Sequence, residues 1–167
     1  MLQKKLRISW HSLLEEGSAK LGLPVGIVSH AYNNLYQVVA INLRLGELIL
    51  GATFPLNQTY CRDVFETDKT VAINEIDGVS GLRLHPLYVS MPLEAYIGTP
   101  IHHKGVVWGT ANFSSPKCRS TFSADEIKLI KGYAQAIERR LDEIDPEPAG
   151  SEHRTHVASR APFRGEG

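Results

Sequence analysis

The stretch EAYIGTPIHHKGVVWGTANFSS, residues 94–115, contains two segments typical of β-strands, joined at Lys104 and Gly105. A short connection that contains glycine is typical of a β-hairpin. Successive side chains of a strand point to opposite faces. The second strand therefore has one apolar face and one face with polar groups, made by Trp108, Thr110, Asn112 and Ser114. Whether Tyr96 of the first strand lies on the same side as this polar face depends on whether the turn has two or three residues, because the turn length sets the register of the hairpin.

An amphipathic helix is predicted to follow this hairpin. Ser123 and Glu126 form a capping box, which marks the start of a helix. Apolar residues then recur at spacings of three and four, at Ile127, Ile130, Ala134, Ile137, Leu141 and Ile144, and a second apolar row runs beside them. One row can cover a sheet while the other contacts a partner helix, either the N-terminal helix or its copy in a second chain.

The chain before residue 94 predicts further elements of the same domain. Residues 10–21 have the apolar spacing of a helix, and residues 25–41 read as a hairpin that turns at Asn33 and Asn34. A strand is predicted at 47–52, a short helix within 53–68 and another strand at 70–74. Residues 75–92 form a long connection, of the kind that often serves as a binding element or lid.

This order of elements predicts an α/β (α+β) fold, in which an antiparallel sheet has helices on one face and a lid on the other. Four stretches, in this order along the chain, resemble a GAF domain: FPLNQTYCRDVFETDKTVAI, HPLYVSMPLEAYIGTPI, KGVVWGTANFSS and FSADEIKLIKGYAQAI. The resemblance is to bacterial sensory GAF domains that precede histidine kinase or diguanylate cyclase domains. It implies a PAS-like sheet of five to six strands and a ligand pocket between the sheet and its lid.

The same resemblance implies a regulatory role rather than an enzyme. We expect a sensor of signal transduction, of the kind found in two-component systems, with a small-molecule ligand and an output kinase or cyclase as partner. A homodimer through the 123–145 helix is also expected. We expect one domain over residues 1–145 and a disordered tail over 146–167, where Pro, Gly, Ser, His and Arg replace the large apolar residues.

The predicted ligand site combines the polar face of the hairpin with the lid and the short helix. Its residues are Tyr60, Cys61, His85, Tyr88, Glu94, Tyr96, Trp108, Thr110 and Asn112. An apolar pocket with a few directed hydrogen-bonding groups is typical of small-ligand sites. In the alternative interpretation, Thr110 and Asn112 only satisfy backbone groups of the lid. The sequence identifies no cofactor.

Cys61 allows two interpretations. In the first turn of a helix beside Arg62, its thiol could be reactive, and a redox enzyme or sensor is the alternative function. Packing as a small apolar side chain is favoured, because no second thiol or base is predicted nearby. The GAF subfamilies that reduce free methionine sulfoxide, attach bilins or bind cyclic nucleotides have cysteine sets or motifs that this chain does not match.

Composition and charge argue against other classes of protein. The chain has 18 basic and 18 acidic residues among 167, which argues against a nucleic-acid partner. No apolar stretch is long enough to span a membrane, and we expect a cytoplasmic protein. His102 and His103 are adjacent in a strand, so we expect them to point to opposite faces of a solvated hairpin end and to share no metal.

Overall fold

The computed structural model describes residues 2–42, 50–76 and 93–146, with the backbone alone for residues 2–8. The elements along the chain are α1 (Leu2–Leu21), β1 (Val25–Tyr32), β2 (Leu35–Ile41), β3 (Thr53–Pro55), the 3-10 turn η1 (Leu56–Gln58), α2 (Arg62–Thr67), β4 (Val71–Ile73), β5 (Ala95–His103), β6 (Val106–Ser115) and α4 (Ala124–Ile144). All strand pairs are antiparallel, and the strand order is β3-β2-β1-β6-β5-β4. This confirms the predicted fold class.

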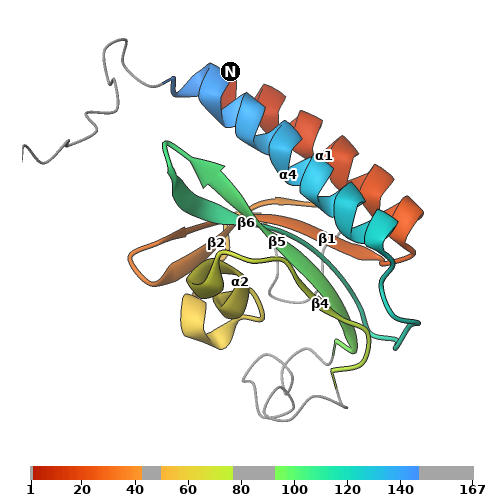
Figure 1. Ribbon diagram of the computed structural model, residues 1–167. Coiled ribbons are helices and arrows are strands. Elements are labelled where there is room, and N and C mark those ends of the chain that lie inside the picture. Colours follow the sequence, from red (N-terminus) through yellow and green to blue (C-terminus); the bar gives the residue numbers. More distant parts are fainter. Residues whose placement is uncertain (1, 43–49, 77–92, 147–167) are drawn as a thin grey trace, which may run out of the picture.

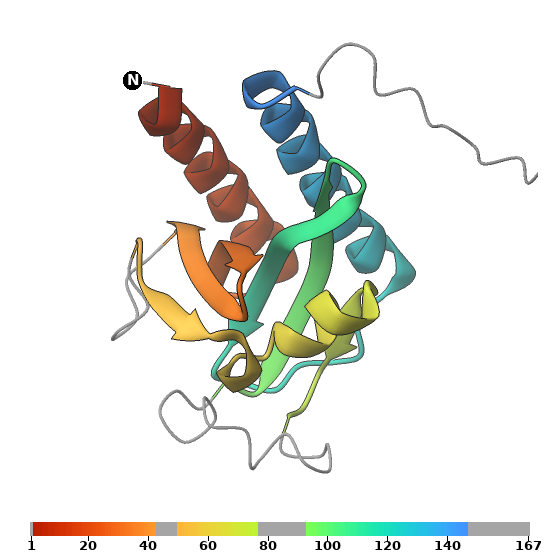
Figure 2. The same ribbon diagram turned by 90° about the vertical axis from the view of Figure 1, so that its left-hand side faces the viewer.

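The sheet lies between two layers. Helices α1 and α4 lie side by side and antiparallel on one face, which we call the helix side (Figure 1). The turn η1 and helix α2 lie on the other face, which we call the lid side (Figure 2). No helix among the described residues is long and apolar enough to cross a membrane. The predicted connection at 75–92 and the predicted tail lie almost entirely outside the described residues.

Two tight turns fix the register of the central strands. Asn33 and Asn34 have φ angles of 49° and 60°, and Lys104 and Gly105 have 52° and 78°. Positive φ at both central residues is the geometry of the two-residue turn that suits the twist of a hairpin. Both predicted hairpins are thus confirmed. In the second, Tyr96 pairs with Ser114 and joins the polar face.

The prediction of a strand at 47–52 is wrong where it can be compared with the structure. Residues 50–52 form no strand, and β3 begins only at Thr53. Gly51 has a φ of 85°, which turns the chain there. The Gly51 amide donates to the Val38 carbonyl, and the Val38 amide donates to the carbonyl of Ala52. Residues 50–52, which were predicted to be part of a strand, therefore belong to a turn. Residues 47–49 lie outside the described part.

Apolar side chains fill both layers. Between the sheet and α1 and α4 the fully buried residues include Leu14, Ile97, Phe113, Ile130 and Ile137. On the lid side a second cluster includes Ile27, Val38, Val64, Ile76 and Tyr96. Helix α1 approaches both the sheet and α4 closely at Gly17, where a Cβ atom would lie 2.8 Å from Phe113 Cε1 and 3.0 Å from Tyr133 Cε2.

The apolar row of α4 packs within its own chain. Ile130, Ala134, Ile137 and Leu141 are buried in the core between the helices and the sheet. As predicted, one row of α4 covers the sheet, and the helix that α4 contacts is the N-terminal helix α1 of the same chain. The homodimer stays a prediction, and it would need the outer surfaces of α1 and α4.

Arg119 joins the two helices at one end. Its guanidinium donates to the Leu21 carbonyl at the end of α1, with Nη1 to O at 3.0 Å. It also donates from Nη2 to Glu126 Oε1 in the first turn of α4, at 2.7 Å, and lies 4.0 Å from the centre of the Phe122 ring. Glu126 in turn completes the predicted capping box with Ser123, which the structure confirms.

Candidate functional site

The polar face of the β5–β6 hairpin is buried on the lid side. Thr110 and Asn112 point toward α2, and Tyr96 on β5 lies among them, since antiparallel partners share a face. All three side chains are at least nine-tenths buried. The structure therefore brings these three side chains together on one buried face. Their role in binding a ligand stays a prediction.

The turn before α2 brings Tyr60 and Cys61 onto this face. Thr59 holds the turn, because its hydroxyl donates to the Leu56 carbonyl at 2.9 Å. Tyr60 and Cys61 are 7% and 3% exposed. The Cys61 thiol donates to Asn112 Oδ1 at 3.6 Å and accepts a hydrogen bond from the Tyr96 hydroxyl at 3.1 Å.

A pair of hydroxyls extends these contacts into β1. Ser29 Oγ lies 2.7 Å from Thr110 Oγ1, and both side chains are buried. We call Ser29, Cys61, Tyr96, Thr110 and Asn112 the polar cluster. Each buried polar group of this set has a hydrogen-bond partner, as burial demands. The alternative role for Thr110 and Asn112, satisfying backbone groups of the lid, concerns residues outside the described part.

A small cavity lies beside the polar cluster, with a volume of about 30 Å³. It has room for about one water molecule. Its described lining is Ile27, Tyr36, Phe54, Thr59, Tyr60, Cys61, Leu93, Tyr96, Asn112 and Ser114. None of these side chains has a formal charge when Cys61 and the tyrosines are protonated. A larger ligand would have to displace a side chain such as Tyr60 or Tyr96, whose rings are 6.0 Å apart.

The polar cluster favours neutral groups. Burial raises the pKa of the Cys61 thiol, although hydrogen bonds with Thr110, Tyr96 and Tyr36 act in the opposite direction. Burial also raises the pKa of Tyr96 well above its ordinary value, and the neighbouring Cys61 adds to this. Arg62 pairs with Asp63, at 3.3 Å between Nε and Oδ1. This environment suits the packing interpretation of Cys61 better than a thiolate.

Trp108 is not part of the polar cluster, and its predicted orientation is wrong. Ile101 pairs with Gly109 but His102 pairs with Val107, so Trp108 is the extra residue of a β-bulge. The bulge turns its side chain to the helix side. There the indole stacks on His30, with ring centroids 4.3 Å apart, and meets Trp10 edge-on at 6.2 Å.

Of the three remaining predicted site residues, one falls within the described part of the chain. Glu94 is partly buried, and its backbone bonds to Ile76 and Ser115 at the start of β5. It is not among the described residues that line the small cavity. His85 and Tyr88 lie outside the described residues.

The histidines of the hairpin differ from the prediction of a solvated end with opposite orientations. Both contact carboxylates of the α4 segment: His102 Nδ1 lies 3.2 Å from Glu138 Oε1, and His103 Nδ1 lies 3.1 Å from Asp142 Oδ1. His103 is only 8% exposed. Among the described residues, no group of His, Cys, Asp and Glu could hold a metal ion.

Sequence reasoning missed Ser29 and Tyr36 on the lid side. Ser29 follows Val25 and Ile27 at a spacing of two, so strand alternation could have placed it beside them. Tyr36 is buried on the same face, where its hydroxyl interacts with Ser29 and Cys61. Only the hairpin register, with Tyr36 opposite Ala31, shows that it reaches this site.

The fold has known relatives. One is the GAF domain region of a Geobacter sulfurreducens PCA protein, with a TM-score of 0.70 and 16% identity, covering 85% of this chain and 96% of that chain. A type II free methionine-R-sulfoxide reductase from Thermoplasma acidophilum gives a TM-score of 0.69 at 12% identity, with 86% and 96% covered. The PixJ GAF domain from Thermosynechococcus elongatus, in its blue-light absorbing form, gives 0.62 at 16%, with 83% and 88% covered.

These TM-scores show a shared fold. No curated protein sequence gives a match. The family model of the GAF domain, however, matches residues 10–141 of this chain. This match agrees with the sheet order, the two helices on one face and the lid-side layer. The chain belongs to the GAF domain family.

Proposed function

We propose that this GAF domain is a small-molecule sensor that binds a ligand at the polar cluster and signals through α1 and α4. The observation that carries the proposal is the buried polar cluster itself. Five hydrogen-bonding side chains from β1, β5, β6 and the start of α2 converge beside an apolar cavity. Convergent polar groups in an apolar site are typical of ligand binding. The PixJ domain, a relative in fold, supports a sensory role.

Strand β6 offers a physical route from the site to the helices. Thr110 and Asn112 face the lid side, while Ala111 and Phe113 alternate with them and face α1 and α4. Phe113 contacts Tyr133 of α4, with ring centroids 6.1 Å apart, and it lies against Gly17 of α1. A ligand that binds one arrangement of these elements more tightly than another shifts their populations.

The partners follow from this role. The domain would act without catalysis of its own, in the cytoplasm, on an output kinase or cyclase or as a homodimer. The dimer would use the outer surfaces of α1 and α4, because the apolar row of α4 is already buried against the sheet.

Native mass spectrometry of the whole chain tests the ligand proposal. We expect the purified protein to retain a small molecule of defined mass. Asn112→Leu keeps a similar volume but removes the amide that contacts Cys61, so the retained molecule should be lost. Trp108→Phe is the matched control on the same strand, because Trp108 faces the helix side. Equal retention by both variants, or a protein that binds no metabolite from a cell extract, contradicts the proposal.

The alternative is a thiol enzyme or redox sensor that uses Cys61. The fold shared with the Thermoplasma acidophilum reductase keeps this candidate open to test. Burial of the thiol and its raised pKa disfavour it. We expect Cys61→Ser to leave any turnover of peroxide or methionine sulfoxide unchanged. A loss of turnover in this variant alone, with Cys118→Ser active, would establish the enzyme instead.

A further inference from the structure

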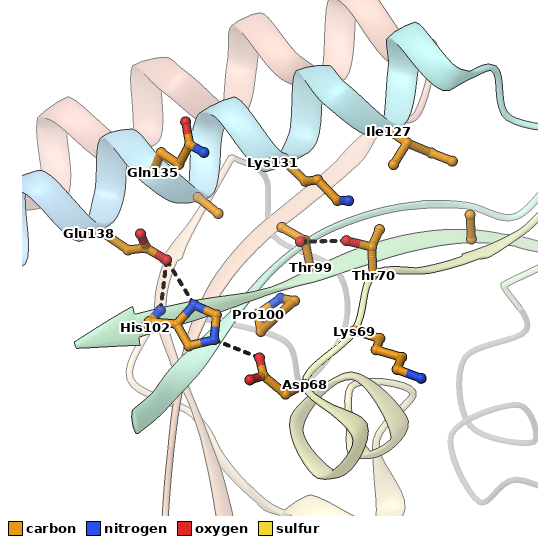
Figure 3. A pocket seen from close by; sticks show the side chains of 12 residues that line it. Asp68, Lys69, Thr70, Thr99, Pro100, His102, Ile127, Lys131, Gln135 and Glu138 are labelled. Atoms are coloured by element: carbon orange, nitrogen blue, oxygen red, sulfur yellow. Dashed lines mark hydrogen bonds and ion pairs between the residues drawn. The ribbon is translucent and has the colours of Figure 1, made fainter. Parts of the chain in front are cut away.

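A second, larger cavity lies on the helix side, between α4 and strands β4 and β5 (Figure 3). Its volume is about 540 Å³, and it shares no described lining residue with the small cavity at the polar cluster. Cavities that bind small ligands have volumes of roughly 300 to 1,000 Å³. We call it the α4 groove.

Small side chains create the α4 groove. Ala134 of α4 is one of its lining residues, and Ala72 and Pro100 line it from the strands. Strand β4 is a short edge strand of three residues, so nothing in the described sheet extends under α4 beyond it. A larger side chain at Ala134 or Ala72 would fill this space. The apolar wall is completed by Ile127.

One end of the α4 groove carries positive charge. Lys131 extends from α4 toward the hydroxyls of Thr99 and Thr70, whose Oγ1 atoms are 2.8 Å apart (Figure 3). Thr99 is 97% buried, so its hydroxyl forms part of the floor. Lys69 also lines the groove, but its side chain points away from Lys131 (Figure 3). Within the described part of the chain, no carboxylate lies within ion-pair distance of either ammonium group.

The acidic groups of the groove gather at its other end and are already engaged. His102 Nε2 lies 2.6 Å from Asp68 Oδ1, and His102 Nδ1 lies 3.2 Å from Glu138 Oε1. The backbone amide of His102 donates to the same Glu138 oxygen at 2.9 Å. The carboxylates are thus bound to one histidine, while neither lysine pairs with a carboxylate among the residues that the structure describes.

We infer that the α4 groove binds a small organic anion. A carboxylate or phosphate group would lie beside Lys131 and accept hydrogen bonds from its ammonium group and from the threonine hydroxyls. The apolar part of the ligand would lie against Ile127 and Ala72. Because α4 forms one wall of the groove, a bound anion would contact this helix directly. It would do so on the helix side of the sheet, whereas the polar cluster lies on the lid side. The site is independent of the proposed sensor ligand.

Amide shifts of the labelled full chain test this inference. Inorganic phosphate and sodium acetate are titrated separately, each against sodium chloride at the same ionic strength. We expect saturable shifts for amides within 69–72, 99–102 and 127–138 with at least one of the two anions, which also tells phosphate from carboxylate preference. Lys131→Ala should weaken binding about tenfold, the loss expected for one charge-assisted contact. Lys128→Ala is the matched control, an exposed lysine of α4 outside the groove.

Three results would overturn the inference. Shifts that chloride reproduces would show ionic strength alone. Equal weakening by Lys128→Ala and Lys131→Ala would show non-specific attraction to the helix. No saturable shift with either anion would show that the groove takes no such ligand. Asn112→Leu should leave anion binding intact, so failure of the sensor proposal and failure of this one remain distinguishable.

Discussion

The Tyr96 hydroxyl donates a hydrogen bond to the Cys61 sulfur, with 3.1 Å between the two atoms. This contact ties strand β5 to the residue that precedes α2, so the thiol is fixed between sheet and lid side. A thiol held in this way is shielded from solvent reagents, whereas Cys118 is exposed. The two cysteines of one chain therefore provide an internal comparison.

We predict that the two thiols react at very different rates. Cys118 should react rapidly with Ellman's reagent in the native protein. The reaction of Cys61 should be limited by the rate of local opening of the lid side. In the Cys118→Ser variant, the remaining thiol should react on the order of a hundredfold more slowly in buffer than in denaturant. Absorbance of the released thiolate measures both rates. Rapid reaction of native Cys61 would contradict its burial.

Alanine at the two glycines of the long helices should have opposite effects on stability. Gly17→Ala places a Cβ atom against Phe113 and Tyr133, and crowding of this kind costs about 1 to 3 kcal/mol. Gly132→Ala has open space around it and should raise the free energy of unfolding by up to about 1 kcal/mol through helix propensity. Urea unfolding measures both. A stabilising Gly17→Ala would show that the helix is not packed so closely.

His102 should make stability depend on pH. Burial alone would lower its pKa, but Asp68 and Glu138 outweigh it, so the folded pKa is raised. A raised pKa gives stability that is complete below the unfolded value of about 6.5 and is lost as pH rises through the folded value. The stability difference between the wild type and His102→Gln should therefore be larger at pH 5.5 than at pH 8.5.

Proton NMR of the His102 ring measures the same pKa directly. The charged or titratable groups near this ring include Asp68 and Lys69 after α2, Lys131, Glu138 and Asp142 on α4, and His103 and Lys104 on the hairpin. Glu138→Gln removes one carboxylate and should lower the midpoint. A titration midpoint of the wild-type His102 ring at or below the ordinary histidine pKa would contradict its contacts with Asp68 and Glu138.

The start of α4 should lose stability in acid. Burial alone would raise the pKa of Glu126, but hydrogen bonds from the Ser123 backbone and from Arg119 lower it overall. A lowered pKa gives stability that is present above the unfolded value of about 4.3 and is lost as pH falls through the folded value. Glu126→Gln should thus destabilise the protein at pH 7 and much less at pH 2.5. Asp125→Asn, in the same helical turn, is the control that should show a smaller difference.

Much of the fold could be predicted because its signals are local. Asn33 and Asn34, and Lys104 and Gly105, identify the two turns without any knowledge of the rest of the chain. Strand alternation alone placed Thr110 and Asn112 on one face. The capping box at Ser123 gave the start of α4.

Features that depend on pairing between distant segments could not be predicted. The bulge at Trp108 arises where β5 and β6 slip by one residue, and nothing in the sequence around Trp108 indicates it. The row containing Ile130 and Ile137 has the same spacing whether it meets a sheet or a partner helix. The α4 groove exists because Ala72 and Ala134 face one space, although they are far apart in the chain.

Arg119 gives the two long helices a common pivot. It fastens the last residue of α1 to the first turn of α4, and at the opposite end of α4 His102 and His103 of the β5–β6 hairpin contact Glu138 and Asp142. The two helices run antiparallel, so the end of α4 that contacts the hairpin lies away from Arg119 (Figure 1). Helix α4 has 21 residues. At about 1.5 Å per residue it forms a lever of about 30 Å, and a tilt of about 5° at the pivot moves its far end by about 2.5 Å. A modest rearrangement of the sheet is thereby magnified at Ile144, where a following segment would receive it.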